Sequence, residues 1–396
     1  MRFPVSSAKC RHPANREIVT FFSATDFCLM QRALTLAARG LFSTSPNPRV
    51  GCVLAQGDEM VGEGWHIRAG EAHAEVHALA AAGARARGAT AYVTLEPCSH
   101  HGRTPPCAEA LIAAGVGRVV VAMRDPNPLV AGRGMAMLRA AGIPTEEGLL
   151  AEEARELNIG FIARMTRGIP WLRLKIAASL DGRTALKNGQ SQWITGAAAR
   201  QDGHRFRARA CALLTGIGTV RADNPQLNVR GVYAESAESE TARQPLKIIL
   251  DSRLELSPEA RLFADGASAL VVSALDDKTR AQPLLDKGAE WLCLPEASNA
   301  AGQGERIDLK RLMQELGRRG LNEVHGEAGA TLNGAFIAAG LADELLVYLA
   351  PCLLGASARP LAALPELENL TERWSFGLQS CACIGQDVRM LCRRLD

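Results

Sequence analysis

Three side chains that bind soft metal ions, one imidazole and two thiols, constrain the fold of this chain most strongly. His73 opens a stretch with helical character, Cys98 follows a β-rich stretch, and Cys107 precedes the next helical stretch. Helix N-termini suit cysteine ligands, because the local dipole and a bound cation favour the thiolate over the thiol. If the three residues share one metal ion, the chain must bring a strand end and two helix starts together. The sequence therefore predicts an α/β arrangement around a zinc site.

Three protein ligands leave the fourth position of a zinc ion open, which is the catalytic form of such a site. Water bound there has its pKa lowered to about 7, so hydroxide is available near neutral pH. Glu75 lies two residues after His73 and is expected to point away from the ligands, free to move protons to a leaving amine. These residues match the zinc deaminase signature H-x-E followed by P-C-x-x-C, except that eight residues separate Cys98 from Cys107. We therefore predict zinc on His73, Cys98 and Cys107, with Glu75 as the general acid and base.

The segments around these residues predict a three-layer α/β/α domain over residues 26–150. Apolar periodicity indicates helices and β-rich runs indicate strands. Helices are expected at 26–40, 73–82, 108–114 and 132–141, and strands at 50–54, 60–63, 91–95, 118–122 and 145–148. A turn at 56–58 joins the first two strands as a hairpin, and one linking helix follows at 151–164.

The chain has 396 residues, more than one hydrophobic core usually supports, so a second domain is expected over residues 151–396. Helices are expected near Arg205, Leu309 and Leu332, between strands at 170–177, 246–251, 269–273, 323–326 and 344–350. Such alternation predicts an α/β domain around one mostly parallel sheet. Residues 1–25 are expected to be a disordered extension, and residues 231–245 a solvated loop.

Composition excludes several classes of protein. The 45 lysines and arginines against 42 acidic residues leave a net charge of +3, which argues against a nucleic-acid-coating surface. No apolar run reaches the roughly 18 residues that a membrane-spanning helix needs. Eleven scattered cysteines, an odd number, do not suggest a disulfide framework, so a reducing cytoplasm is expected. The oligomeric state stays open, a homo-oligomer included.

The long insert between Cys98 and Cys107 resembles the cysteine loop of the deaminase domain in bacterial riboflavin biosynthesis, and differs from the short loop of cytidine or transfer-RNA adenosine deaminases. Further matching stretches lie at 46–52, 125–128, 174–183, 191–195, 219–225 and 327–332. From about residue 27 to 392, the chain resembles the family of bifunctional diaminohydroxyphosphoribosylaminopyrimidine deaminases and 5-amino-6-(5-phosphoribosylamino)uracil reductases. The resemblance implies a cytidine-deaminase-like domain followed by a dihydrofolate-reductase-like α/β domain that uses NADPH.

The resemblance also implies roles for individual residues. Asn47 would hold the pyrimidine, and His66 with His101 or Arg103 would lie near the ribose phosphate.

In the second domain, NADPH would contact Ala177, Trp193, Thr219, Asp223, Ser252 and Gly329. Gly329 stands at a helix start whose free N–H groups suit phosphate oxygens. The reductase substrate would contact Ser191, Arg207, Leu227, Arg230 and Glu327. Arg207 and Arg230 make chemical sense as a phosphate clamp, although the arginines near 205 also fit a solvated helix face. His77 and His100 are alternative metal ligands that the family pattern does not use.

The implied function is a two-step conversion of phosphorylated pyrimidines. Zinc-dependent hydrolysis would remove an amine from 2,5-diamino-6-(5-phosphoribosylamino)pyrimidin-4-one. NADPH would then reduce the ribosyl group of 5-amino-6-(5-phosphoribosylamino)uracil to ribityl. Two alternatives stay open: a nucleoside or transfer-RNA deaminase with an accessory domain, and a zinc-stabilised binding module without catalysis.

Overall fold

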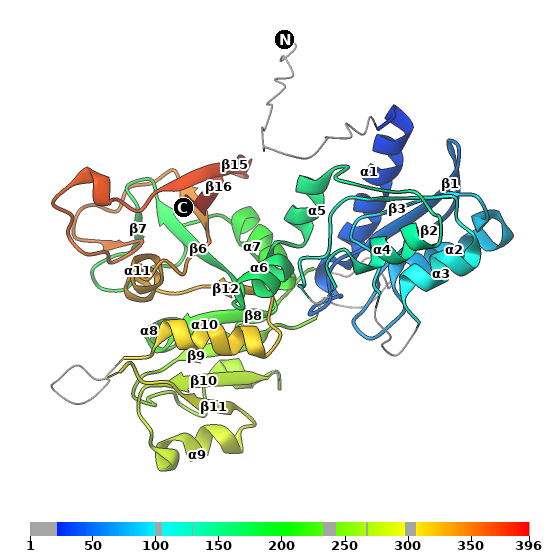
Figure 1. Ribbon diagram of the computed structural model, residues 1–396. Helices are drawn as coiled ribbons and strands as arrows, with labels where there is room; N and C mark the ends of the chain where they lie inside the picture. Colours follow the sequence, from blue (N-terminus) through cyan, green and yellow to red (C-terminus); the bar gives the residue numbers. More distant parts are fainter. Residues whose placement is uncertain are drawn as a thin grey trace, which may run out of the picture.

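Two α/β regions, each built around its own sheet, make up the computed structural model of this protein (Figure 1). The structure describes residues 22–99, 105–128, 130–232, 243–266, 268–297 and 306–395. The first region, residues 22–147, has a sheet of order β2-β1-β3-β4-β5. The second region, residues 171–395, has a sheet of order β11-β10-β9-β8-β12-β6-β13-β16-β15. Within the described ranges, no helix is both long and apolar enough to cross a membrane.

Helices cover both faces of the first sheet, as the predicted three-layer arrangement requires. Its elements are α1 (Ala24–Arg39), β1 (Gly51–Gln56), β2 (Glu59–Trp65), α2 (Ala74–Ala82), β3 (Thr90–Val93), α3 (Cys107–Ala114), β4 (Arg118–Val121), α4 (Arg133–Ala140) and β5 (Thr145–Glu147). One face of β1 packs Leu54 with Ala78 of α2 and Leu111 of α3. The opposite face packs Val53 with Met30 of α1. Alternate residues of one strand thus fill two separate cores, which confirms a sheet buried on both sides.

The helix at the start of the described chain begins at Ala24, two residues before the predicted boundary. The side chain of Ser23 accepts a hydrogen bond from the backbone N–H of Asp26, and the Asp26 carboxylate accepts one from the N–H of Ser23. This reciprocal pair satisfies two N–H groups that the first helical turn leaves free. Residues 1–21 of the expected extension lie outside the described residues.

The prediction of one linking helix at 151–164 is wrong. Two helices, α5 (Ala151–Leu157) and α6 (Ile159–Arg167), meet at Asn158. The Asn158 side chain accepts from the Arg49 N–H at 2.8 Å and donates to the Arg49 carbonyl at 2.9 Å. The helix is interrupted where this amide binds a distant segment of backbone.

The second sheet is parallel from β11 to β13, and β16 and β15 add an antiparallel edge. Its strands are β6 (Trp171–Ser179), β8 (Ala212–Gly216), β9 (Leu246–Leu250), β10 (Ala269–Ser273), β11 (Glu290–Cys293), β12 (Glu323–Gly326), β13 (Glu344–Ala350), β15 (Phe376–Ile384) and β16 (Asp387–Arg394), and the pair β7 (Arg183–Ala185) and β14 (Arg359–Pro360) stands apart. Its helices are α7 (Ala197–Arg209), α8 (Ile217–Asp223), α9 (Lys278–Asp286), α10 (Leu309–Arg318) and α11 (Ala330–Ala338), and short 3-10 helices lie at Gly40–Phe42, Gly83–Ala86, Arg261–Phe263 and Leu370–Glu372. The predicted mostly parallel sheet is confirmed, whereas β8, β11 and the final hairpin were not predicted.

The two faces of the second sheet differ in chemistry. Leu172 and Val324 pack into an apolar core with Phe336 of α11. On the other face, Arg173 of β6 lies beside His325 of β12, and both side chains are buried. Charged residues that alternate with apolar ones would, by themselves, suggest a strand with one exposed face. Here these charged residues form a buried ionic layer.

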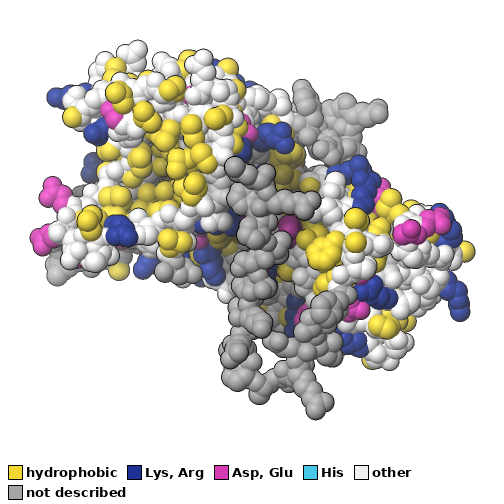
Figure 2. Space-filling model, turned by 90° about the horizontal axis from the view of Figure 1, so that it is seen from above, with side chains coloured by type: hydrophobic (Ala, Val, Ile, Leu, Met, Phe, Trp, Pro, Cys, Tyr) yellow, Lys and Arg dark blue, Asp and Glu magenta, His cyan; other side chains and the backbone are white. Residues whose placement is uncertain are grey.

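Exposed apolar side chains gather over the half of the molecule that contains the second sheet (Figure 2). Large exposed apolar side chains in this region include Trp193, Leu353 and Leu378. Leu378 belongs to β15, which is an edge strand of the sheet. An edge strand with apolar side chains is a surface suited to contact with another chain.

Candidate active sites

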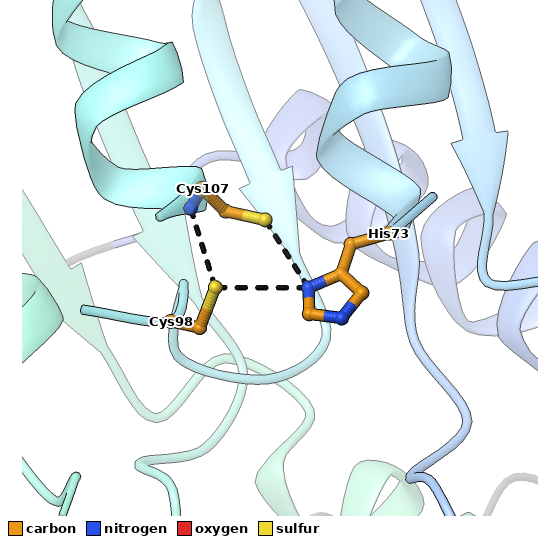
Figure 3. A group of neighbouring side chains, drawn as sticks. All are labelled: His73, Cys98 and Cys107. Atoms are coloured by element: carbon orange, nitrogen blue, oxygen red, sulfur yellow. Dashed lines mark hydrogen bonds between the residues drawn. The ribbon is translucent and has the colours of Figure 1, made fainter. Parts of the chain in front are cut away.

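The predicted metal ligands meet in the first region, where their side chains point toward one another (Figure 3). His73 is the N-cap of α2, Cys98 follows β3, and Cys107 is the first residue of α3. The His73 Nδ1 atom lies 3.6 Å from the Cys98 sulfur and 3.3 Å from the Cys107 sulfur. Because the His73 side chain makes no capping hydrogen bond, its ring is free to face the two sulfurs.

This donor set fits a zinc ion. Zinc bonds of about 2.3 Å to sulfur and about 2.0 Å to nitrogen place tetrahedral N and S ligands about 3.6 Å apart. The three ligand atoms all lie within 4.8 Å of one another. The backbone N–H of Cys107 donates to the Cys98 sulfur at 3.2 Å. The Cys107 side chain and His73, against the effect of burial, lower the pKa of Cys98 to about 4, which favours the thiolate that a metal needs.

Glu75 lies in the first turn of α2 and is buried. The expectation that it points away from the ligands is wrong, because its carboxyl group lies beside the Cys107 side chain. Burial raises the pKa of Glu75 to about 7, although the charge of His73 opposes this. A carboxyl group that gains and loses a proton near neutral pH suits proton transfer next to the metal ligands.

Asn47 reaches the same centre through His66. The His66 Nδ1 atom lies 3.0 Å from the Ala72 carbonyl, which can only accept, so Nδ1 carries the hydrogen. Nε2 of the neutral ring then accepts from Asn47 Nδ2 at 3.1 Å, and Asn47 Oδ1 is the amide atom left to accept from a ligand. The His66 ring packs edge-on against His73, with centroids 5.3 Å apart.

The remaining histidine predictions have different outcomes. His77 lies one turn after His73 on α2, and its Nε2 is buried without a hydrogen bond. His77 does not belong to the group of potential ligands among the described residues. His100, His101 and Arg103 lie outside the described residues.

Sequence analysis missed Glu96, a buried carboxylate two residues before Cys98. It accepts hydrogen bonds from the backbone N–H groups of Asp125, Gly132, Gly134 and Met135. This carboxylate therefore holds Asp125 and residues 132–135 against the segment that leads from β3 to Cys98. The available signal was an acidic residue at the end of a buried strand, where an unpaired charge is costly.

A cavity of about 760 Å³ opens on the charged face of the second sheet. This volume lies within the range typical of ligand sites. Nine of the predicted residues line it: Ala177, Ser191, Trp193, Arg207, Thr219, Asp223, Leu227, Arg230 and Glu327. Leu227 has a φ of +51°, a conformation that bulky residues rarely adopt and that is found at ligand sites.

Two predicted NADPH contacts do not line this cavity. Ser252 follows β9, where its carbonyl accepts from the N–H groups of Ala274 and Leu275. Gly329 is the N-cap of α11. Contact of Ser252 and Gly329 with NADPH therefore stays a prediction.

Arg207 and Glu327 form a two-pronged ion pair in this cavity. The Arg207 Nε and Nη2 atoms donate to the two Glu327 oxygens at 2.5 and 2.7 Å. Burial opposes ionisation of Glu327, but Arg207 more than offsets it and holds the Glu327 pKa well below its usual value. Arg207 is thus paired with a carboxylate, and its role as a phosphate ligand stays a prediction.

Two further ionisable groups in the cavity had no predicted role. Lys175 lies two residues before Ala177 on β6 and lines the same cavity, so strand alternation was the signal that could have found it. The His204 Nδ1 atom accepts from the Arg230 N–H at 3.2 Å. Burial, together with the positive charges of Arg207 and Arg230, lowers the His204 pKa to about 4. His204 is therefore neutral at physiological pH.

Both regions of the chain match families of known proteins. Residues 24–123 match the cytidine and deoxycytidylate deaminase zinc-binding region, and residues 170–389 match the RibD C-terminal domain. Riboflavin biosynthesis protein RibD of Escherichia coli is 50% identical over 366 residues, which cover 91% of this chain and 96% of that protein.

Solved structures of similar proteins superpose on nearly the full length of this chain. RibD of Acinetobacter baumannii (form 1) has a TM-score of 0.85 and 46% identity, covering 94% of this chain and 99% of that one. A Thermotoga maritima diaminohydroxyphosphoribosylaminopyrimidine deaminase/5-amino-6-(5-phosphoribosylamino)uracil reductase has a TM-score of 0.80 and 31% identity, with the same two coverages of 94% and 99%. The chain therefore belongs to the RibD family of riboflavin biosynthesis, bifunctional enzymes with a zinc-dependent deaminase domain and an NADPH-dependent reductase domain.

Proposed function

We propose that His73, Cys98 and Cys107 hold the zinc ion of the deaminase and that Glu75 moves the protons of hydrolysis. The observation that carries this proposal is the convergence of one imidazole nitrogen with two sulfurs, which lie 3.3 and 3.6 Å from it, beside a buried carboxyl group. When bound, zinc supplies the Lewis acidity that makes water reactive near neutral pH. Glu75 takes a proton on its carboxylate and returns it to the departing amine.

Asn47 orients the pyrimidine in this site. Its Oδ1 atom accepts a hydrogen bond from an N–H group of the substrate, because His66 fixes Nδ2 on the other side of the amide. A substrate held in this way presents its amine to the metal centre in one orientation, which lowers the entropic part of the barrier.

In the reductase domain, Glu327 and Arg230 hold the phosphorylated pyrimidine, with Ser191 and Leu227 beside it. Arg207 contacts the substrate beside them, and its ion pair also fixes the Glu327 carboxylate. Ala177, Trp193, Thr219, Asp223, Ser252 and Gly329 are the proposed NADPH contacts. When bound, NADPH supplies the hydride, and the protein contributes the position of the two reactants.

The deaminase domain is proposed to span residues 26–150 and the reductase domain residues 151–396. The substrates are phosphorylated pyrimidines and not nucleic acids, because the cavity is compact and net charge is only +3. The free cysteines favour a cytoplasmic enzyme. The exposed apolar side chains near β15 favour a homo-oligomer.

Glu75→Gln tests the assignment of the deaminase centre. Glutamine keeps the shape of the side chain but cannot take up a proton, so ammonia release should fall about 10²- to 10⁴-fold. NADPH oxidation with the deaminated substrate and zinc content should stay at the wild-type level. Loss of both activities in a folded, zinc-loaded variant would contradict separate sites, and unchanged ammonia release would remove Glu75 from the mechanism.

A further inference from the structure

The loop at residues 45–49 lies between the two domains. On one side it carries Asn47, which is joined to the metal ligand His73 through His66. On the other side it contacts residues of the reductase domain, and Figure 1 shows the two domains meeting near β12, β8 and α6. A displacement of this loop would therefore move Asn47 relative to the metal centre.

Three polar contacts from the reductase domain fix this loop. The Asn322 Nδ2 atom donates to the Pro46 carbonyl at 2.8 Å. The Ser45 hydroxyl lies 2.8 Å from the Cys211 sulfur, and Arg49 Nη1 donates to Glu323 Oε1 at 2.7 Å. The partners of the loop come from the start of β12 and from the residue before β8.

The Arg49 contact belongs to a buried ionic cluster. Glu323 also accepts from Arg209 at 2.6 Å and lies 3.4 Å from Arg173, and its side chain is only 1% exposed. Arg49 in turn donates to the Leu157 carbonyl at 2.7 Å, while Asn158 binds both backbone polar groups of Arg49. Charged hydrogen bonds in a dry environment hold their partners rigidly, because separating them leaves a buried charge unpaired.

The neighbouring Asn322 contact is equally constrained. Asn322 is 4% exposed, and its Oδ1 accepts from Arg164 Nε at 2.6 Å. Since Arg164 occupies the oxygen, Nδ2 is the atom that faces Pro46. The carbonyl next to Asn47 is thus bonded to a side chain of the other domain, whose own orientation is fixed.

We propose that Asn322 and Glu323 of the reductase domain are positioning residues of the deaminase site: they clamp the loop at 45–49 and so place the Asn47 amide against the metal centre. This inference rests on the proposed role of Asn47. The deaminase site is then complete only when the reductase domain is packed against it.

Asn322→Asp is the sharpest test in the full-length chain. Aspartate has the same shape and keeps an oxygen for Arg164, but it presents a second oxygen to the Pro46 carbonyl, so an attraction becomes a repulsion. The deamination KM should rise about tenfold, as expected when a substrate-orienting group is displaced by a fraction of an ångström. The zinc content and the KM of reduction for NADPH should not change. Asn322→Ala, which removes the donor without adding a charge, should shift the deamination KM in the same direction by less, and replaces aspartate where the latter does not fold.

The matched control is Asn333→Asp on α11. Asn333 is also a buried asparagine of the reductase domain, and it donates to the carbonyls of Ala328 and Leu361. This control should lower the melting temperature but leave the deamination KM unchanged. A deamination KM that Asn322→Asp leaves unchanged, or a proportional fall of both activities, would overturn the inference.

Asn47→Ala separates failure of this inference from failure of the proposed function. A raised deamination KM in Asn47→Ala, together with an unchanged one in Asn322→Asp, would refute only the clamp. An unchanged KM in Asn47→Ala would refute the role of Asn47 itself and the clamp with it.

Discussion

The metal centre and the reductase cavity are built on different principles. The three proposed metal ligands lie within residues 73–107: His73 and Cys107 stand at the starts of α2 and α3, and Cys98 lies in the segment between β3 and α3. The cavity draws its lining from residues 175–327, and its central feature is an ion pair between α7 and the end of β12. A site that depends on three ligands is lost when one is removed. A cavity with many contacts loses its function by degrees, because each contact supplies part of the binding energy.

Arg207→Lys tests the graded behaviour of the cavity. Lysine keeps the charge but cannot form the two parallel bonds to Glu327, so that carboxylate loses its fixed orientation. We expect kcat/KM for reduction to fall about 10- to 100-fold, the equivalent of one or two charge-assisted hydrogen bonds. Ammonia release should not change.

The control for this variant is Arg205→Lys, on the same helix but exposed, which should behave like the wild type. An equal loss of deamination in Arg207→Lys would show that the two sites are not separable in the way described. Complete loss of reduction would show that the cavity, like the metal centre, depends on one group.

A smaller effect is expected from the pH dependence of folding. The His204 pKa is lowered from 6.5 to about 4 in the folded protein, chiefly by burial. The unfolded chain therefore binds the proton more readily, so the contribution of neutral His204 to stability is fully present above pH 6.5 and is lost as the pH falls toward 4.

His204→Gln removes this titration. The advantage in melting temperature of the wild type over this variant should shrink between pH 7.5 and pH 5, when both are measured with the zinc-loaded protein. A difference that stays constant over this interval would mean that His204 binds protons equally in the folded and unfolded states.

The two sites also differ in how far the sequence predicts them. The convergence of His73, Cys98 and Cys107 was predictable, because few residue types bind zinc and because two of the three stand at helix starts. The parallel strands β6, β9, β10, β12 and β13 were predictable from apolar runs between helical segments. The break at Asn158 was not, because its partner Arg49 is 109 positions away in the sequence.

Charged residues account for most of what was missed. Arg173, Lys175 and His325 alternate with apolar residues, a pattern typical of a half-exposed strand. In the structure Arg173 and His325 are buried. Arg173 pairs with Glu323 and lies over Phe206 of α7. Glu323 in turn pairs with Arg209 of α7 and with Arg49 of the other domain. The position of Glu75 beside Cys107 likewise depends on how α2 and α3 pack, which local spacing does not determine.

The central claim is that one nitrogen and two sulfurs hold a single catalytic zinc ion. Metal analysis of the purified wild type and of Cys107→Ala, with both activities measured on the same preparations, tests it most directly. We expect one zinc per chain and ammonia release in the wild type, and loss of both in Cys107→Ala while NADPH oxidation continues. A wild-type protein that releases ammonia without zinc, or a Cys107→Ala variant that keeps both its zinc and its deaminase activity, would contradict the claim.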